Sequence, residues 1–350
     1  MSQTSQVFKD SLAAEPPRQI QSTENRGMGL ARLARTAGMW AVLVAGTATA
    51  ADSGLDVSTV TTGTAHRDLY AVAIGDDGHG IAVGDRGSLV VTSDGGQTWE
   101  RRDYDTRRAF LDIAMAGERQ VAVGQDGMIL WRDGDGEWTE VEPITEERLL
   151  GVSINRDGFG VAVGTFGAMI MTTDGGESWS DVDFDITQVI DGGYQAHLND
   201  VTVTADGAAL AVGEFGLVLR AAADARDWQV VRRGESSLFS IKMRGDGTGY
   251  AVGQEGTVSR STDGGQTWTD LETGIEGNLL GVHADDNGHI LAPGMRHMIY
   301  SDDDGDTWQL VTAGDVDENW YMGAVAADDG SVLAVGHTGR IIRIGEARTN

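Results

Sequence analysis

The sequence predicts an all-β fold, a seven-bladed β-propeller of four-stranded antiparallel blades that closes by pairing its N- and C-terminal strands. A cassette of the form Ala-Val-Gly-x-x-Gly recurs along the chain, with a decayed sixth copy that reads APGMRH. Successive cassettes lie 40, 40, 49, 40, 41 and 42 residues apart, and no segment between them has helical periodicity. The first glycines of the cassettes are Gly84, Gly124, Gly164, Gly213, Gly253, Gly294 and Gly336.

The first full period shows how one repeat forms a blade. Short apolar or alternating runs at Leu69–Ile74, Gly80–Val83, Ser88–Thr92 and Thr98–Tyr104 are separated by turns rich in Gly and Asp. We expect each run to be one strand of an antiparallel sheet. Because one small sheet cannot bury both of its faces alone, neighbouring blades must pack against each other.

The last period supplies only three strands, of which the third lies at Arg340–Ile344. We expect the alternating stretch Asp56–Thr61 to provide the missing outer strand, because pairing the two ends removes an open sheet edge. Residues 51–350 then form a single propeller domain, since the even spacing of the repeats leaves no room for a linker.

A second repeated feature lies downstream of the cassettes. Four copies read TSDGGQTW, TTDGGESW, STDGGQTW and SDDDGDTW, and weakened copies end at Trp138 and Trp228. They resemble the Asp-box, also called the bacterial neuraminidase repeat. We expect the Asp to bond the backbone of a tight turn and the Trp to pack between repeats, rather than a metal-binding or catalytic role. These structural residues are Asp94, Trp99, Asp174, Trp179, Asp263, Trp268, Asp303 and Trp308.

Residues 1–50 have the features of a secretory signal peptide. Three arginines between residues 26 and 35 precede a mainly apolar run at Met39–Ala45, and the Ala-Thr-Ala of residues 48–50 matches a cleavage pattern. The polar stretch before Met28 is long for such a leader, so Met28 is an alternative start. The apolar run is too short to anchor the chain in a bilayer, and we expect a periplasmic protein.

Composition limits the partners. The chain has 26 Lys and Arg against 54 Asp and Glu, a net charge of −28, which disfavours nucleic acid and anionic membranes. It has no Cys, and its seven His are too dispersed for a zinc site. Acidic turns at 302–306 and 133–137 could hold calcium, but solvated turns fit their incomplete pattern better. We expect a monomer without cofactor or metal.

The loops divide between two faces of the expected ring. The hairpins between first and second strands, such as those at Asp76 and Asp285, are acidic and share a face with the Asp-box turns. The opposite face, here called the top face, carries the loops after the cassettes and the connections between blades. These loops either bind a partner through Arg and aromatic side chains or are ordinary loops with Arg paired to acids. The candidate binding residues are Arg67, Arg86, Arg108, Arg148, Phe166, Phe215, Arg296, His297, Trp320 and His337.

One period is longer than the others. Trp179 and Trp228 lie 49 residues apart, and the extra residues fall in the top-face connection between Asp181 and His197. Repeat proteins place functional insertions in such loops, although an insertion without a role also fits the sequence. Tyr194 and His197 are its candidate contact residues.

Asp-boxes also occur in sialidases, so a glycoside hydrolase or a glycan-binding protein is the alternative function. A sialidase-like site would include an Arg-Ile-Pro motif, and none of the four Pro follows Ile. A strongly anionic protein is also poorly suited to attract an anionic sugar. With 54 acidic residues, spacing alone selects no catalytic pair of carboxylates. We therefore expect no enzyme activity and no catalytic residue.

The cassettes, the Asp-box turns and the leader together resemble the photosystem II assembly and stability factor family, seven-bladed propellers of the thylakoid lumen and periplasm. The resemblance covers residues 56–344. It implies a scaffold that binds a membrane protein during assembly through an Arg-rich face, whose similar positions here are Arg67, Arg86, Arg108, Arg148 and Arg296. The acidity of this chain departs from the family. Relatives in non-photosynthetic bacteria imply a different envelope complex as partner, such as a transporter.

Overall fold

The computed structural model describes residues 51–190, 192–223 and 225–346. The predicted signal peptide and its cleavage motif therefore lie outside the described residues. Within these ranges every helix is a single three-residue turn, and none is long and apolar enough to cross a membrane. The described chain is otherwise built from strands and their connections, which form seven β-sheets.

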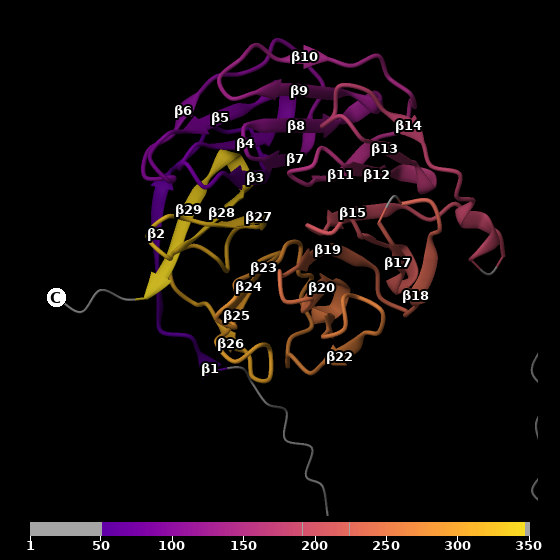
Figure 1. Cartoon of the computed structure of the whole chain (residues 1–350). Helices are drawn as coiled ribbons and strands as arrows, with labels where there is room; N and C mark the ends of the chain where they lie inside the picture. Colours follow the sequence, from indigo (N-terminus) through magenta and orange to yellow (C-terminus); the bar gives the residue numbers. More distant parts are fainter. Residues whose placement is uncertain (1–50, 191, 224, 347–350) are drawn as a thin grey trace, which may run out of the picture. The chain divides into compact units, whose positions relative to one another are not determined.

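The seven sheets are the blades of a ring, which confirms the predicted fold (Figure 1). In each blade the first strand lies nearest the centre of the ring and the later strands follow outward (Figure 1). Blades 1 to 3 contain β3 (Leu69–Ile74), β4 (Gly80–Gly84), β5 (Leu89–Thr92) and β6 (Glu100–Arg101); β7 (Phe110–Ala116), β8 (Arg119–Gly124), β9 (Ile129–Asp133) and β10 (Thr139–Glu140); and β11 (Leu149–Ile154), β12 (Gly160–Gly164), β13 (Met169–Thr172) and β14 (Ser180–Asp181).

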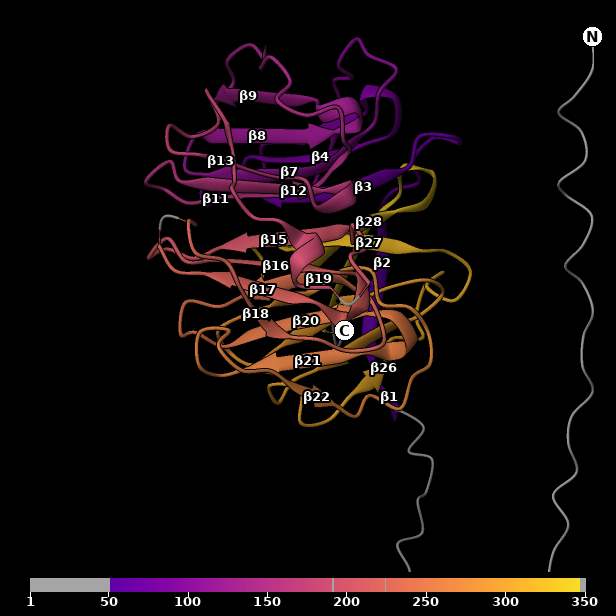
Figure 2. The same cartoon turned by 90° about the vertical axis from the view of Figure 1, so that its right-hand side faces the viewer.

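Blades 3, 4 and 5 are seen next to one another from the rim in Figure 2. Blades 4 to 6 contain β15 (Leu198–Val203), β16 (Ala209–Gly213), β17 (Val218–Ala221) and β18 (Gln229–Arg232); β19 (Leu238–Met243), β20 (Gly249–Gly253), β21 (Val258–Ser261) and β22 (Thr269–Leu271); and β23 (His283–Ala284), β24 (Ile290–Pro293), β25 (Met298–Ser301) and β26 (Gln309–Leu310). Blade 7 contains β27 (Tyr321–Ala326), β28 (Val332–Gly336), β29 (Ile341–Glu346) and β2 (Leu55–Thr61).

The ring closes by pairing its two ends. β2 pairs antiparallel with β29, with Val57 opposite Ile344, and forms the outer strand of blade 7. One feature departs from the prediction of four strands in every blade. β1 (Ala51–Asp52) pairs in parallel with β26, so blade 6 has five strands. The chain between β1 and β2 therefore joins the outer edges of blades 6 and 7 (Figure 1).

The core lies between the blades. The cassette strands β4, β12, β16 and β20 are buried at every residue. Side chains alternate along a strand, so Ala82 packs in the cluster shared with blade 7, and Ile81 and Val83 pack in the cluster shared with blade 2. The cassette glycine is needed where the first strand approaches, because a Cβ at Gly84 would lie 1.9 Å from the carbonyl oxygen of Asp68.

The four complete Asp-box-like segments, residues 92–99, 172–179, 261–268 and 301–308, are here called the box turns. In the third of them, Asp263 accepts hydrogen bonds from the hydroxyl of Ser261 at 2.9 Å and from the amide and hydroxyl of Thr267 at 2.9 and 2.6 Å. The hydrogen bond from the Thr267 hydroxyl is the largest cause that lowers the pKa of Asp263, to about 2. The Trp268 indole donates to the carbonyl oxygen of Gly265 at 3.1 Å. These contacts give the Asp a structural role.

Asp303 and its neighbour Asp302 allow a matched test of that role. Asp303 accepts from the Ser301 hydroxyl at 2.8 Å and from the Thr307 amide and hydroxyl at 2.8 and 2.7 Å, whereas Asp302 is exposed. We expect Asp303→Ala to lower the Tm by about 2 to 8 °C, because a turn that loses these acceptors loses about 1 to 3 kcal/mol. Asp302→Ala should change the Tm by about 1 °C or less. Equal shifts in differential scanning calorimetry would contradict this role.

Candidate functional site

The structure places the loops on two faces as the sequence predicts. The cassette turns bond to the connections between blades: the Gly87 amide donates to the Arg108 carbonyl and the Gly127 amide to the Glu147 carbonyl, both at 2.9 Å. The box turns bond instead to the hairpins between first and second strands, for example from the Gly95 amide to the Gly78 carbonyl at 3.0 Å. The first set of loops forms the top face, and the second set forms the opposite, bottom face.

The top face repeats one backbone conformation in all seven blades. The residue two positions after the first cassette glycine has a positive φ, between 52° and 59°, although it is never glycine. Non-glycine residues in this region carry strain and cluster where side chains have a function. A constant turn thus presents seven variable side chains, at Arg86, Asp126, Phe166, Phe215, Glu255, Arg296 and Thr338.

Exposed large apolar side chains gather on the same face. Five such residues are exposed in the described part of the chain, with Tyr194 at 65%, Phe166 at 53% and Phe215 at 46%. All five lie in cassette turns or in connections between blades. Exposed aromatic residues rimmed by polar groups are typical of protein interaction sites. The set is Ile144, Phe166, Tyr194, Phe215 and Met295.

The longer connection between blades 3 and 4 shapes one part of this surface. Ile186 and Ala196 are buried and hold the insertion against the core, which leaves Tyr194 exposed between them. His197 lies at the end of the insertion, where its Nδ1 accepts a hydrogen bond from the Phe166 amide at 2.9 Å. The Phe166 and His197 rings meet edge to face with centroids 4.9 Å apart. The structure therefore joins two of the predicted contact residues.

A second group lies where blades 7 and 1 meet. Trp320 stacks on Tyr70 with ring centroids 6.1 Å apart and lies 5.9 Å from the His337 ring. Arg67 binds the Arg86 carbonyl oxygen at 3.1 Å. Tyr70 is not among the predicted contact residues, because it lies in an apolar run that predicts only a core strand. Its position could have indicated a place on the top face, because it is the second residue of a first strand and follows a top-face loop.

The other predicted contact residues lie on the top face but apart from these groups. Arg108 forms an ion pair with Glu140 at 2.5 Å, and the His297 ring lies 3.0 Å from the Met295 carbonyl oxygen. Arg148 and Arg296 are exposed, and neither side chain has an ion-pair partner among the described residues. These two guanidinium groups are therefore available to carboxylates or carbonyl groups of a partner.

A narrow channel runs through the centre of the ring. Its cavity of about 170 Å³ is smaller than the roughly 300–1,000 Å³ that small-molecule sites usually need. The innermost segment of each blade contributes a residue to the lining at the same register position. These residues are Tyr70, Leu111, Leu150, Asn199, Phe239, Leu280 and Met322.

Two half-buried carboxylates line the channel and connect blades. Asp112 accepts from the Val152 amide of the next blade at 2.7 Å, and Asp200 accepts from the Ile241 amide and the Ser240 hydroxyl at 2.9 Å. Burial raises the pKa of both groups, that of Asp200 to about 6. Because the oxygens are taken up by backbone amides, this pair is positioned to hold blades together rather than to transfer protons.

The raised pKa of Asp200 predicts a pH-dependent stability. Its pKa is raised above the unfolded value of 3.8, so between pH 4 and 6 the folded protein holds a proton that the unfolded chain has lost. The free energy of unfolding should fall as pH rises through this window, by roughly 1.4 kcal/mol per unit at most, and stay lower above it. Asp112 on β7 adds to the fall, while Lys242 on β19 opposes it.

Denaturant unfolding at pH 4, 5, 6 and 7 measures this dependence. Asp200→Asn should flatten the decline relative to the native chain, because the variant has no carboxyl group to titrate. Asp157→Asn, which changes an exposed carboxylate on the bottom face, should leave the decline as it is. If the free energy of unfolding fell with pH equally steeply in Asp200→Asn and in the native chain, Asp200 would not be the group that causes the decline.

Arginine side chains pair with acidic residues in both turns considered as calcium sites, and in the turn at 133–137 Arg119 pairs with Asp133 at 2.9 Å. Asp304 pairs with Arg244 at 2.5 Å and Asp306 with Arg260 at 2.8 Å, while Asp303 is bonded within its own box turn. A cation would have to displace these guanidinium groups to bind there. No group of three or more His, Asp or Glu side chains at metal-binding distance occurs in the described ranges.

Fold and surface together define a β-propeller of the BNR-repeat type whose top face carries exposed apolar and arginine side chains. Residues 53–143 match the family model described as photosynthesis system II assembly factor YCF48. This match confirms the resemblance seen in the sequence over that part of the chain. None of the curated proteins matches the chain.

Three solved structures share the fold. YCF48 bound to a D1 peptide is 19% identical, with a TM-score of 0.67, and the match covers 84% of this chain and 99% of that one. YCF48 from Cyanidioschyzon merolae is also 19% identical, with a TM-score of 0.67 over 83% of this chain and 99% of that one. A streptogramin B lyase is 14% identical, with a TM-score of 0.69 over 83% and 97%.

Proposed function

We propose that this protein is a non-catalytic propeller that binds a polypeptide partner on its top face. The observation that carries the proposal is the position of the exposed large apolar side chains, all of which lie on that face in the described part of the chain. The similar YCF48 structure holds a D1 peptide, which supports a polypeptide as the class of ligand.

The surface favours a partner segment of mixed chemistry. The Phe166, Tyr194 and Phe215 side chains offer anchors for apolar groups around blades 3 and 4. Arg296 and Arg86 lie in the cassette turns of blades 6 and 1, and Arg86 is 64% exposed. Guanidinium groups there would bind carboxylates or backbone carbonyl groups. The partner is thus expected to present an apolar side chain together with acidic or carbonyl groups.

The proposal includes export and an envelope partner. If residues 1–50 are a cleaved leader, the mature chain begins at Ala51 or Asp52, the two residues of β1. N-terminal sequencing or intact-mass analysis of the protein from a periplasmic fraction should find one of these ends. Recovery of the intact leader in a membrane fraction would contradict a released periplasmic protein.

Capture from an envelope extract tests the function. The mature chain should retain one membrane or envelope polypeptide, identified by mass spectrometry, and Arg86→Glu with Arg296→Glu should lose it. A panel of glycosides tests the alternative function, and we expect no turnover. Hydrolysis of any glycoside above the background of a heat-inactivated sample would replace the proposal with an enzyme.

A further inference from the structure

Three grooves between neighbouring blades differ in size, and the largest lies where the second of the two blades has no box turn. Blade 7 has no box turn, and the groove between blades 6 and 7 measures about 680 Å³. Blades 2 and 4 have weakened copies, and the grooves between blades 1 and 2 and between blades 3 and 4 measure about 420 and 280 Å³. The box turn of one blade thus fills a groove against the blade before it.

Contacts of the complete box turns show how they fill the groove. A Cβ on Gly96 would lie 2.2 Å from Leu333, and a Cβ on Gly265 would lie 2.1 Å from Leu210. Each glycine therefore packs directly on the second strand of the preceding blade. The residue at the same register on blade 6 is Leu291, one position before the cassette-strand Ala292. Leu291 lines the large groove without the glycine of a box turn, and its exposed surface is only 2% because it belongs to the apolar cluster between blades 6 and 7.

A donor from the preceding blade also holds the box turn. In three blades the third-strand residue that pairs with this second-strand position is an arginine. Each of these arginines donates a hydrogen bond to a carbonyl oxygen in the box turn of the next blade. On blade 6 this position is Tyr300, opposite Leu291. The Tyr300 hydroxyl has no hydrogen bond within the described ranges, and it lines the groove. The three arginine contacts are Arg220 to Gly264 at 2.9 Å, Arg260 to Asp304 at 2.8 Å and Arg343 to Gly96 at 2.8 Å.

Ring closure explains why this groove is open. β29 runs straight on to Glu346, which pairs with Leu55, instead of turning. Ile344 lies where the four blades with complete box turns have the Thr or Ser hydroxyl that bonds the box Asp. Its partner Val57 takes the register position of the box Trp, which is a much larger side chain. Blade 7 therefore supplies neither the turn nor the aromatic ring.

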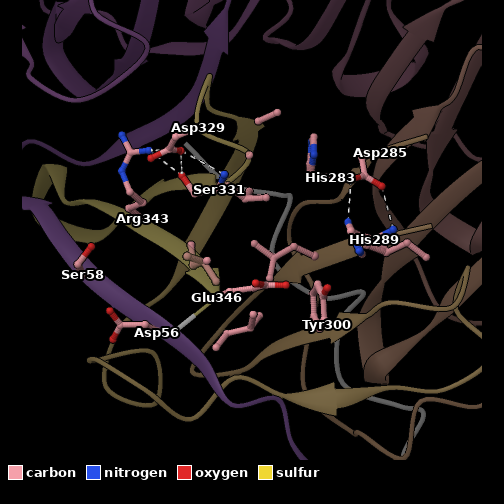
Figure 3. A pocket seen from close by; sticks show the side chains of 18 residues that line it. Asp56, Ser58, His283, Asp285, His289, Tyr300, Asp329, Ser331, Arg343 and Glu346 are labelled. Atoms are coloured by element: carbon pink, nitrogen blue, oxygen red, sulfur yellow. Dashed lines mark hydrogen bonds and ion pairs between the residues drawn. The ribbon is translucent and has the colours of Figure 1, made fainter. Parts of the chain in front are cut away.

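The charges around the groove limit what can enter it. Asp285 and His289 lie 2.9 Å apart on one side, and Asp329 and Arg343 pair at 2.7 Å on the other (Figure 3). Glu346 also lines the groove and has no ion-pair partner among the described residues. The excess of carboxylates disfavours an anionic occupant.

We propose that this groove is a second binding site, which accepts a glycine-containing β-turn with an aromatic side chain and no net negative charge from a partner polypeptide. The turn lies where a box turn of blade 7 would lie, with its glycine against Leu291 and a carbonyl oxygen on the Tyr300 hydroxyl. A second copy of the chain is a poorer occupant, because its own box turns are packed against preceding blades. The site is separate from the top face and does not depend on the function proposed for it.

A cyclic peptide of sequence TSDGGKTW tests this site. It reproduces residues 92–99 with Gln97 changed to lysine, so that it is neutral and already turned. We expect the full-length exported protein to bind it with a Kd of about 1 mM or tighter in a heteronuclear NMR titration. The peptide TSDVVKTW should not bind, because valine fits neither the positive φ nor the close approach to Leu291.

Variants locate the bound peptide. Leu291→Trp enlarges a nearly buried side chain at the base of the groove, so it should weaken binding more than about tenfold and also lower the Tm. Tyr300→Phe should weaken binding about threefold with an unchanged Tm. Arg86→Glu on the top face should bind like the native chain. The proposal fails if no binding occurs at 5 mM, if the valine peptide binds equally, or if Tyr300→Phe and Leu291→Trp bind like the native chain. Loss of peptide binding in Arg86→Glu would place the peptide on the top face. Self-association of the protein that Leu291→Trp abolishes would identify a second copy of the chain as the occupant. Either result would overturn this site and leave the proposed function unaffected.

Discussion

Deleting residues 51–61 should lower the Tm by about 10 °C or more. The deletion removes β2, whose pairing with β29 completes blade 7, and exposes β29 as a sheet edge. It also removes Leu55 and Val57 from the core between blades 6 and 7. For a chain of this size each kcal/mol shifts the Tm by about 2 to 4 °C, and the loss of a strand with its apolar contacts costs several kcal/mol. Differential scanning calorimetry measures the shift.

A shorter deletion provides the control for this experiment. Removing residues 51–53 takes away β1 and its two-residue parallel pairing with β26 but leaves β2 in place. The Tm should then fall by about 2 °C or less. If the longer deletion left the Tm unchanged, the terminal strands would not hold the ring closed in solution.

Changing four top-face side chains together should weaken partner binding about a hundredfold or more. The variant combines Arg86→Glu and Arg296→Glu with Phe166→Ala and Phe215→Ala. Truncating one partner of a buried charge pair costs about 2 to 5 kcal/mol, and an aromatic anchor at the centre of an interface costs about 2 kcal/mol. The four residues are exposed, so the Tm should move by no more than about 3 °C. Biolayer interferometry with the captured polypeptide measures the affinity.

Charge reversals on the bottom face are the matched control for that variant. Asp157→Arg and Asp286→Arg change two exposed residues of the hairpins between first and second strands. Binding should stay within a few-fold of the native chain, while the salt dependence of the association rate changes. If these reversals abolish binding and the top-face variant binds normally, the acidic face is the recognition surface.

Much of the fold could be predicted because each blade repeats its local signals. The spacing of the cassettes gives the number of blades, and the three-stranded last period points to Asp56–Thr61 as the closing strand. β1 was not predicted, because its two residues pair outside the repeat pattern. The outer strand of blade 1 is also shorter than its apolar pattern indicates, at Glu100–Arg101, since the box turn uses the residues before it.

The candidate surface was harder to predict than the fold. Loop positions in a propeller follow from strand order, so the predicted Arg and aromatic residues do lie on one face. Which of them meet depends on backbone turns and packing between blades, and so the contact of Phe166 with His197 and the stack of Trp320 on Tyr70 were not predicted. The groove beside Leu291 was not foreseen either, because it results from a turn that the last repeat lacks.

Site-specific photocrosslinking in the intact cell envelope tests the central claim most directly. A photoreactive amino acid at Phe215 or Phe166 should attach the protein to one and the same polypeptide, and the same group at Asp157 on the bottom face should give no such adduct. Mass spectrometry of the adducts identifies the partner and the contact segment. An adduct formed from Asp157 but not from the two phenylalanine positions, or the absence of an adduct at all three, would contradict a polypeptide-binding top face.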